Sequence, residues 1–380
     1  MNASVASMIY KFNMDNISLL EECGYQVEIA CNFGRDNPMN KEEIYQFKSI
    51  LKEKKIKIYE TDCPRSLFAF GRMIKTYREL KYLAKHGNYD LVHTQSPIGG
   101  VLCRLAFQKA RKRGVKVIYT AHGFHFFKGA PLHNWVLYYP IEKLCSSLND
   151  ILITINKEDF ERAKKSFYCS EIDYIPGVGV DVDRFREQAV TKKEKRKELA
   201  IPENAFVLLS VGELSKRKNH QVIINALGQI EDENIYYIIA GKGSEYEYYQ
   251  KLAKKNKLGD RLVLLGSRTD INELCSAADV FVHPSVREGL GIAPLEGMAA
   301  GLPLITSYVN GIKDYTKDDI TGCCVQNPRD VEAFKKAIIK MRDDRLFREN
   351  CIKKNGEIVK KFSMDESKKA MKIIYENITN

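Results

Sequence analysis

Apolar positions along this chain alternate between two patterns. Short runs rich in β-branched residues, bounded by Gly, Pro or polar residues, predict buried strands, and longer stretches with helical spacing lie between them. In the first half the expected strands are Gln26–Cys31, Ile56–Tyr59, Leu91–Thr94, Val115–Thr120, Ile151–Ile155 and Ile172–Ile175. In the second half they are Ala205–Val211, Ile235–Ala240, Leu262–Leu265, Val280–His283 and Leu304–Thr306.

This alternation predicts an α/β fold of parallel sheets covered by helices on both faces. Amphipathic stretches such as Leu67–Lys85 and Gly99–Arg113 supply the connecting helices. Two such runs predict two Rossmann-like doubly wound domains, and the Gly-rich segment Pro176–Asp181 places the boundary between residues 1–176 and 177–362. Ligands of such domains bind outside the carboxyl ends of the strands.

The start of the chain departs from this rhythm. A doubly wound domain needs a central strand before the first helix, which we expect within Asn13–Glu22. The preceding residues Met1–Ser7 are mostly small and have low strand propensity. The first strand is therefore expected to be short or missing.

The composition excludes several classes of protein. Hydrophobic residues make up 44% and charged residues 29% of the 380 residues, as in a soluble globular protein. No apolar run has the length of a membrane span, and the first residues lack the pattern of a secretion signal. The ten cysteines show no metal-binding spacing, so we expect reduced thiols, a cytoplasmic location and no metal.

The positive charge is unevenly distributed. The formal net charge is +11, and Leu91–Ile141 contains no Asp or Glu. That segment carries seven cations: Arg104, Lys109, Arg111, Lys112, Arg113, Lys116 and Lys128. No nucleic-acid-binding motif accompanies them, so the pattern favours an anionic membrane surface over nucleic acid. A solvated lysine-rich face is the alternative.

The most informative motif is a pair of glutamates, Glu288 and Glu296, within Arg287–Gly297. The motif follows the strand Val280–His283, and Pro294 suits the first turn of a helix. We therefore expect Glu288 on a Gly-rich loop and Glu296 in the first helical turn, beside free N–H groups that bind anions. Carboxylates suit sugar hydroxyls and N–H groups suit phosphate, which indicates a nucleotide sugar. The alternative is a solvated loop charge and a glutamate that stabilises the helix dipole.

Two other loops follow predicted strands. Gly212–His220 follows Ala205–Val211 and carries Lys216, Arg217 and Lys218, cations that could neutralise a diphosphate. His122 follows Val115–Thr120 next to a glycine, a place where a side chain points toward a ligand site. A purely structural histidine, or solvated lysines at a helix start, would give the same patterns.

Together these stretches resemble the retaining GT-B glycosyltransferases of family 4 that build bacterial exopolysaccharides and capsules. The resemblance rests on the glutamate pair and on Gly-Phe-His-Phe-Phe-Lys-Gly, Leu-Ile-Thr-Ile-Asn-Lys-Glu-Asp and Pro-Gly-Val-Gly-Val-Asp. It implies a UDP-sugar donor, an acceptor saccharide on a polyprenyl diphosphate at the cytoplasmic membrane face, and no metal. It also implies that a last helix, residues 363–380, packs back on the first domain.

The resemblance assigns roles to particular residues. Glu296 would bind the donor ribose, Glu288 the transferred sugar and His122 the reacting centre. The donor phosphates and base would contact Gly212, Arg217, Lys218, Arg268 and the N–H groups of Leu290 and Gly291. The acceptor would contact Ser4, Ser7, His125 and Lys128. Glu213 departs from the family, because an arginine that clamps phosphate is usual at its position.

Two alternatives remain at this stage. A UDP-N-acetylglucosamine epimerase shares the architecture and would act without an acceptor. A nucleotide-sugar-binding partner without turnover would be consistent with Glu213 and with the short first strand.

Overall fold

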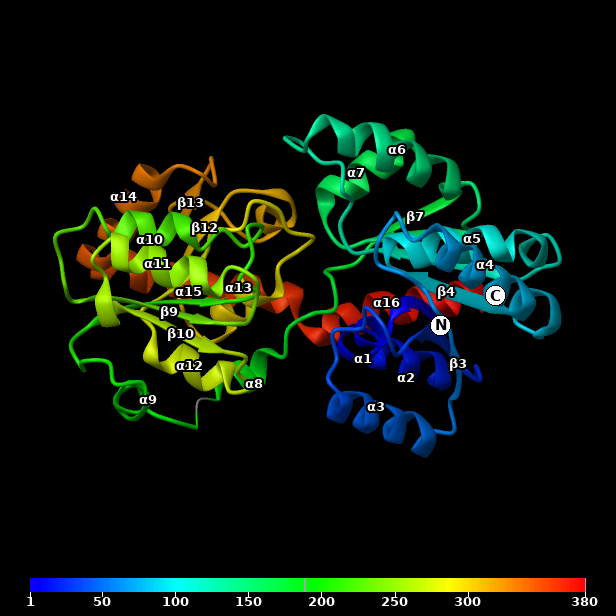
Figure 1. Ribbon diagram of the computed structural model, residues 1–380, viewed down its shortest axis with the longest axis horizontal. Helices are drawn as coiled ribbons and strands as arrows, with labels where there is room; N and C mark the ends of the chain where they lie inside the picture. The colour runs from blue at the N-terminus through cyan, green and yellow to red at the C-terminus, as the bar shows by residue number, and fades with distance from the viewer. Residues whose placement is uncertain (188, 380) are drawn as a thin grey trace. The chain divides into compact units, whose positions relative to one another are not determined.

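The computed structural model describes residues 1–187 and 189–379, which form two compact units (Figure 1). The first unit comprises residues 1–178 together with the chain from Ser367 onward, and the second comprises Gly179–Glu366. The predicted α/β class with two Rossmann-like sheets is confirmed. No helix within the described residues combines the length and apolarity that crossing a bilayer requires.

The first unit is built on a seven-stranded parallel sheet of order β3-β2-β1-β4-β5-β6-β7. Its strands are β1 (Asn2–Val5), β2 (Glu28–Asn32), β3 (Lys57–Glu60), β4 (Leu91–Gln95), β5 (Lys116–Ala121), β6 (Ile151–Thr154) and β7 (Glu171–Tyr174). Its helices are α1 (Ala6–Phe12), α2 (Met14–Glu22), α3 (Lys41–Glu53), α4 (Phe70–His86), α5 (Pro97–Arg111), α6 (Leu132–Ser146) and α7 (Lys157–Ser166). Buried apolar side chains of β4, β5 and α5 form part of its core.

The strand that was expected to be short or missing is present. β1 has four residues, all buried, and pairs in parallel with β2 and β4 at the centre of the sheet. The low strand propensity of its residues is overcome by pairing on both sides: Asn2 lies opposite Ala30 and Thr94, and its side-chain amide donates to the Ala30 carbonyl at 3.0 Å.

The last helix, α16 (Met364–Thr379), belongs to the first unit from Ser367 onward. Its Tyr375 is fully buried, and the hydroxyl lies 2.8 Å from His93 Nδ1 on β4. His93 Nε2 in turn lies 2.8 Å from Thr120 Oγ1 on β5. Burial lowers the pKa of His93 to about 3, so this histidine is a neutral link between the helix and two central strands.

The second unit repeats the arrangement with a six-stranded parallel sheet of order β10-β9-β8-β11-β12-β13. Its strands are β8 (Phe206–Val211), β9 (Ile235–Ala240), β10 (Leu262–Gly266), β11 (Val280–His283), β12 (Leu304–Ser307) and β13 (Gly322–Val325). Its helices are α8 (Val182–Arg186), α9 (Lys192–Glu198), α10 (Gln221–Leu227), α11 (Tyr246–Lys255), α12 (Ile271–Ala277), α13 (Ile292–Ala299), α14 (Val331–Asp343) and α15 (Arg345–Ile358). β13 was not predicted, because its Gly-Cys-Cys-Val sequence is too short to show a pattern.

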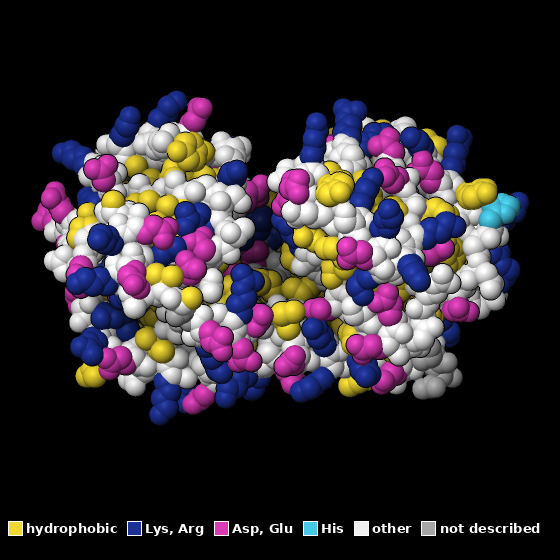
Figure 2. All heavy atoms as spheres, turned by 90° about the horizontal axis from the view of Figure 1, so that it is seen from below, with side chains coloured by type: hydrophobic (Ala, Val, Ile, Leu, Met, Phe, Trp, Pro, Cys, Tyr) yellow, Lys and Arg dark blue, Asp and Glu magenta, His cyan; other side chains and the backbone are white. Residues whose placement is uncertain are grey.

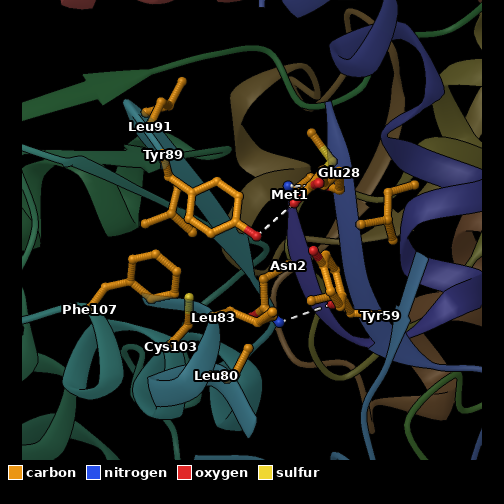
Figure 3. A pocket seen from close by; sticks show the side chains of 13 residues that line it. Met1, Asn2, Glu28, Tyr59, Leu80, Leu83, Tyr89, Leu91, Cys103 and Phe107 are labelled. Atoms are coloured by element: carbon orange, nitrogen blue, oxygen red, sulfur yellow. Dashed lines mark hydrogen bonds between the residues drawn. The ribbon is translucent and has the colours of Figure 1, made fainter. Parts of the chain in front are cut away.

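A small, largely apolar pocket lies at the amino end of β1, where β2 and β4 also begin (Figure 3). Within it the Tyr89 hydroxyl donates to Glu28 Oε2 at 2.6 Å. Ligands of doubly wound sheets bind at the carboxyl ends of the strands, so this pocket lies at the opposite edge from the expected site.

Candidate functional site

The candidate donor site lies where the strand order of the second sheet reverses. β8 and β11 are adjacent, with Leu208 opposite Val280, although the chain forms β9 and β10 between them. The loops that follow these two strands are therefore brought together, and ligands bind at such switch points. The Val286 N–H donates to the Arg217 carbonyl at 2.9 Å, and the Asn219 side-chain amide donates to the Pro284 carbonyl at 3.0 Å.

Glu288 is the centre of this junction. Lys218 Nζ lies 2.6 Å from Glu288 Oε1, and the Arg217 guanidinium donates to the same atom at 3.1 Å. Two polar residues at the end of β11 complete the set: Ser285 Oγ donates to Oε1 at 2.8 Å and His283 Nε2 lies 3.1 Å away. Among the residues that the structure describes, no group hydrogen-bonds to the second oxygen, Oε2. The carboxylate is thus fixed through one oxygen and open at the other.

The surroundings keep this carboxylate ionised. Burial alone would raise the pKa of Glu288, but the neighbouring cations, Lys218 foremost, hold it well below its usual value. Burial is also the main reason why the pKa of His283 is lowered, followed by the charge of Lys218. A neutral His283 that donates to Glu288 is consistent with both shifts.

Helix α13 begins beside Glu288. Its N-cap is Gly291, whose φ of 84° favours glycine, and the Tyr315 hydroxyl donates to the Gly291 carbonyl at 3.1 Å. A Cβ at Gly291 would lie 3.1 Å from the Tyr315 hydroxyl oxygen, so a side chain there would crowd the turn. The first N–H groups of a helix lack partners within the helix and attract anions.

Glu296 does not lie in the first turn of α13, as the sequence had indicated. The helix starts at Ile292, so Glu296 is its fifth residue and lies in the second turn. Pro294 is the third residue of α13 and lies in its first turn, as predicted, but Glu296 follows two residues later and falls outside that turn. Within the described part of the chain no group hydrogen-bonds to the Glu296 carboxyl; burial raises its pKa to about 6, and the charge of Arg184 partly opposes that rise.

Of the other predicted donor residues, Gly212 lies in the loop after β8 and Arg268 lies after β10. Gly212 directly follows β8 and has a φ of 152°. A Cβ at Gly241 would lie 1.8 Å from the Gly212 carbonyl oxygen, so these two glycines let adjacent loops pack closely. Glu213 is exposed, with Oε2 4.0 Å from the Arg217 guanidinium. Arg268 lies after β10, where it pairs with Asp270 at 2.5 Å and Glu198 at 3.0 Å; it does not contact Glu288.

In the first unit, His122 follows β5 as predicted and belongs to a polar chain. His122 Nε2 lies 2.5 Å from Gln95 Oε1 at the end of β4, and the Asn13 side-chain amide donates to the same oxygen at 3.0 Å. Burial lowers the pKa of His122 to about 4, so the imidazole is neutral near pH 7.

The four predicted acceptor residues have different surroundings. The Ser4 hydroxyl is buried, 2.8 Å from Ser96 Oγ, and accepts from the Gly99 N–H at 3.0 Å. The Ser7 N–H donates to Asn37 Oδ1 at 3.3 Å. The His125 ring stacks on Tyr138 with centroids 4.5 Å apart, and the exposed Lys128 donates through its backbone to Glu158. The Ser4 hydroxyl therefore joins β1 to α5, and the structure does not gather the four side chains into one cluster.

Sequence reasoning did not single out four residues that the structure places at these sites: His283, Ser285, Tyr315 and Gln95. A signal existed for two of them, because His283 and Gln95 are polar residues at the carboxyl ends of predicted central strands. Ser285 and Tyr315 carry no such signal, since their roles depend on loop conformation. No group of three or more His, Cys, Asp or Glu side chains that could hold a metal occurs in residues 1–187 and 189–379.

Comparison with known proteins agrees with this geometry. Residues 15–184 match the model for Glycosyltransferase Family 4, and residues 191–358 match that for Glycosyl transferases group 1. The chain is 40% identical over 257 residues to EpsD of Bacillus subtilis (strain 168), which is assigned as a glycosyltransferase. The matched region covers 67% of this chain and 68% of EpsD. It is 33% identical over 317 residues to the Escherichia coli UDP-Gal:alpha-D-GlcNAc-diphosphoundecaprenol alpha-1,3-galactosyltransferase, which covers 80% and 79%.

Solved structures share the fold at low identity. Anabaena Alr3699/HepE in complex with UDP and glucose superposes with a TM-score of 0.75 at 16% identity, covering 100% of this chain and 98% of that one. The lipopolysaccharide glycosyltransferase WaaG superposes with a TM-score of 0.73 at 18% identity, covering 100% of both.

The two parallel sheets share the GT-B fold with these structures, and the family matches show that the chain is a glycosyltransferase. The chain belongs to glycosyltransferase family 4.

Proposed function

We propose that this glycosyltransferase moves a sugar, with retention of anomeric configuration, from a UDP-sugar to a saccharide carried on a polyprenyl diphosphate during cell-surface polysaccharide synthesis. The observation that carries the proposal is the Glu288 carboxylate, ionised, fixed through one oxygen and open at the other beside the start of α13. The Escherichia coli relative is named for such a reaction, and several structures of the same fold hold UDP or UDP-glucose.

The second unit binds the donor in this proposal. Glu296 accepts hydrogen bonds from the ribose hydroxyls, since its carboxyl has no partner within the described residues. The N–H groups of Leu290 and Gly291, with Lys218, Arg217 and the Gly212 turn, bind the diphosphate, and Arg268 lies toward the base. Glu288 contacts the transferred sugar through its open oxygen.

The chemical step follows from these charges. As the bond between sugar and UDP breaks, negative charge develops on the leaving diphosphate, where the helix N-terminus and the cations stabilise it. The acceptor hydroxyl attacks from the same face of the sugar, and a donor phosphate oxygen takes its proton. No metal is required. The first unit binds the acceptor, with His122 at the reacting sugar and Ser7, His125 and Lys128 toward the acceptor, whereas the buried Ser4 hydroxyl supports the sheet.

A UDP-release assay tests the proposal. Wild type is incubated with a panel of UDP-sugars, with and without a polyprenyl-diphosphate saccharide, in EDTA, and Glu288→Ala is assayed beside it. Release that needs both one donor and the lipid, and is lost in the variant, is the expected result. Epimerisation of UDP-N-acetylglucosamine in the absence of acceptor would overturn the proposal.

One residue favours a second candidate, a nucleotide-sugar-binding protein without turnover. Glu213 is exposed at the position where the family has a phosphate-clamping arginine, and its charge disfavours a diphosphate. Calorimetry separates the two functions: UDP binding without release from any donor supports the inactive partner.

We further propose that the enzyme works at the inner face of the cell membrane, where its acceptor resides.

A further inference from the structure

One motif that carried the family resemblance, residues 152–159, has no role in the proposed function. It comprises most of β6, the loop that follows this strand and the first residues of α7. β6 pairs in parallel with β5, so the loops after the two strands meet at the same edge of the sheet. The loop after β5, residues 122–129, is the one that carries His122 and His125.

Two adjacent carboxylates of this motif bind the backbone of that loop. The Phe124 N–H donates to Asp159 Oδ2 at 2.9 Å, and the Lys128 N–H donates to Glu158 Oε1 at 2.8 Å. The two N–H groups lie on either side of His125 in the sequence. The start of α7 therefore fixes the path of the loop at two points.

Asp159 is itself held in place. Its side chain is buried, and the Asn156 amide donates to the same oxygen, Oδ2, at 2.8 Å. Asn156 is the N-cap of α7, and its Oδ1 accepts the Asp159 N–H at 2.8 Å. Burial raises the pKa of Asp159 to about 6, and the hydrogen bonds from Phe124 and Asn156 oppose that rise. Oδ2 is thus a fixed acceptor for the loop.

The loop is also anchored by apolar packing. Phe124 and Phe126 are buried, and their rings stack with centroids 4.8 Å apart. His125, between them, is only partly buried, and its ring stacks on Tyr138. The loop therefore places its phenylalanines in the core and leaves a histidine nearer the surface.

Acidic residues in the first turn of a helix often do no more than stabilise the helix dipole. Here the oxygens of Asp159 and Glu158 accept N–H groups from a different segment of the chain. A buried N–H that loses its acceptor costs about 1–3 kcal/mol, so these contacts constrain the conformation of the loop.

A field of surface cations would be a less specific way to bind an acceptor that carries a diphosphate. On the face shown in Figure 2, acidic and basic side chains are interspersed over both units and form no patch of one sign. In the basic segment of the first unit, Arg111 pairs with Asp150 at 3.1 Å. Side chains held at fixed positions, such as those of the loop after β5, are therefore the better candidates for acceptor recognition.

We propose that Asp159 is a positioning residue, which holds residues 122–129 in the conformation that presents the two histidines of this loop to the acceptor saccharide. Glu158 supports the far end of the same loop. Asp159 itself touches no substrate and acts through the Phe124 N–H. The proposal rests on the proposed function for the acceptor, whereas the conformation of the loop can be measured without any substrate.

The single tryptophan of the chain, Trp135, reports on this loop. Its ring lies 5.7 Å from that of Phe126, between ring centroids. The Arg162 guanidinium, which donates to Glu158 at 2.8 Å, lies 4.8 Å from the Trp135 ring centroid. Because tryptophan emission depends on the polarity of its surroundings, a displaced loop should shift the emission to longer wavelength.

A pair of Asp159 variants tests the proposal. Asp159→Asn keeps an oxygen that can accept both hydrogen bonds, whereas Asp159→Leu has a similar size and no acceptor. Asp159→Leu should raise the acceptor KM roughly tenfold and shift the Trp135 emission, and Asp159→Asn should stay within about twofold of the wild-type KM. The donor KM should be the same in all three proteins, because the donor binds the second unit.

The substrate probes are UDP-galactose and alpha-D-GlcNAc-diphosphoundecaprenol, for which the Escherichia coli relative is named, followed by the panel of UDP-sugars. Asp330→Leu is the matched control, since Asp330 accepts the Ala333 N–H at 2.9 Å at the start of α14 in the second unit. This control should leave the acceptor KM and the emission unchanged.

Thermal melts identify variants that do not fold. If Asp159→Leu is one of them, Glu158→Leu against Glu158→Gln repeats the comparison at a less buried contact, with an expected rise in acceptor KM of about threefold. A variant that is only partly folded would lose kcat and keep its acceptor KM.

The proposal is overturned if the folded Leu variant keeps the wild-type acceptor KM and emission. It is also overturned if Asp159→Asn is as impaired as Asp159→Leu, because the hydrogen-bond acceptor would then not be the cause. If the emission shifts as expected but no protein releases UDP from any donor, the assignment of Asp159 to the loop stands and the proposed function falls.

Discussion

Lys218 Nζ lies 2.6 Å from Glu288 Oε1, which joins the loop after β8 to the loop after β11 by an ion pair. Both side chains are largely buried, at 13% and 9% exposure. The same lysine that the sequence assigns to the diphosphate is thus already bound to the carboxylate that the sequence assigns to the sugar. An incoming diphosphate would meet a cation oriented by Glu288, not a mobile surface lysine.

Replacing Lys218 by Met should destabilise the protein as well as inactivate it. The substitution leaves the Glu288 charge buried with fewer partners, a change that costs about 3 kcal/mol in comparable buried pairs. Urea unfolding measures this loss of unfolding free energy, and UDP-release assays measure the loss of activity. Lys251→Met, at an exposed position on α11, should change neither; equal stability of the two variants would contradict the prediction.

Glu288→Gln should lower turnover more than donor binding. The amide keeps the shape of the side chain but removes the charge near the transferred sugar, and loss of one preorganised electrostatic contact typically costs roughly 10²- to 10³-fold in kcat. The Kd for UDP, measured by calorimetry, should change by only about threefold, because UDP lacks the sugar. Glu233→Gln, at an exposed position before β9, is the control. Turnover like that of wild type would remove Glu288 from the site.

Glu296→Gln should stabilise the fold while weakening the donor complex. Burial raises the pKa of Glu296 from an unfolded value of 4.5 to about 6, so the ionised group costs about 2 kcal/mol of unfolding free energy above pH 6. That penalty disappears below pH 4.5, where the group is protonated in both states. At pH 7.5 the variant should therefore unfold at higher urea concentration, yet bind UDP-sugar roughly tenfold more weakly. A variant that is less stable than wild type would contradict the conclusion that the buried Glu296 carboxylate lacks a stabilising partner.

The same carboxyl should make donor binding depend on pH. A Glu296 with a pKa of about 6 is ionised at pH 7.5 and protonated at pH 5, and the ionised form accepts stronger hydrogen bonds from ribose hydroxyls through both oxygens. Affinity for a UDP-sugar, whose diphosphate does not titrate in this range, should fall as the pH drops through 6. Calorimetry at several pH values checks this, and Glu296→Gln should flatten the profile.

Glu213→Arg should tighten UDP binding. Glu213 is exposed on the loop that carries Arg217 and Lys218, and its negative charge repels a diphosphate at that loop. Reversing the charge should lower the Kd for UDP by roughly three- to tenfold at low salt, with a smaller gain at high salt. Glu213→Gln should give an intermediate Kd. Weaker binding by both variants would show that Glu213 contributes to the donor site.

Most of the fold was predictable because parallel strands buried on both faces form continuous apolar runs. β9 and β11 were predicted with their observed bounds, since each ends where a Gly or Pro begins a loop. The presence of β1 could not be predicted from its residues, because the strand is stabilised by pairing with β2 and β4 and local strand propensity does not include such pairing. β13 was missed because its four residues, Gly-Cys-Cys-Val, are too few to show a pattern.

The candidate site was predictable only in part. The sequence showed which residues follow predicted strands, and the family resemblance assigned Lys218 and Glu288 to the same donor. It could not show that four donors converge on a single oxygen of Glu288, because Ser285 and His283 reach it through the conformation of one loop. The helical turn of Glu296 also escaped prediction, since helix starts are uncertain by one or two residues.

The buried contact between Tyr375 and His93 has a consequence for how the protein is made. The second unit is one continuous segment, whereas the first is completed by the last residues of the chain. During synthesis the second unit can finish folding while His93 still lacks the Tyr375 hydroxyl, because α16 is made after that unit. A chain cut before Ser367 would therefore leave the His93 imidazole without its hydroxyl partner and without the helix that supplies it, and the amino-terminal half expressed by itself would remain incomplete.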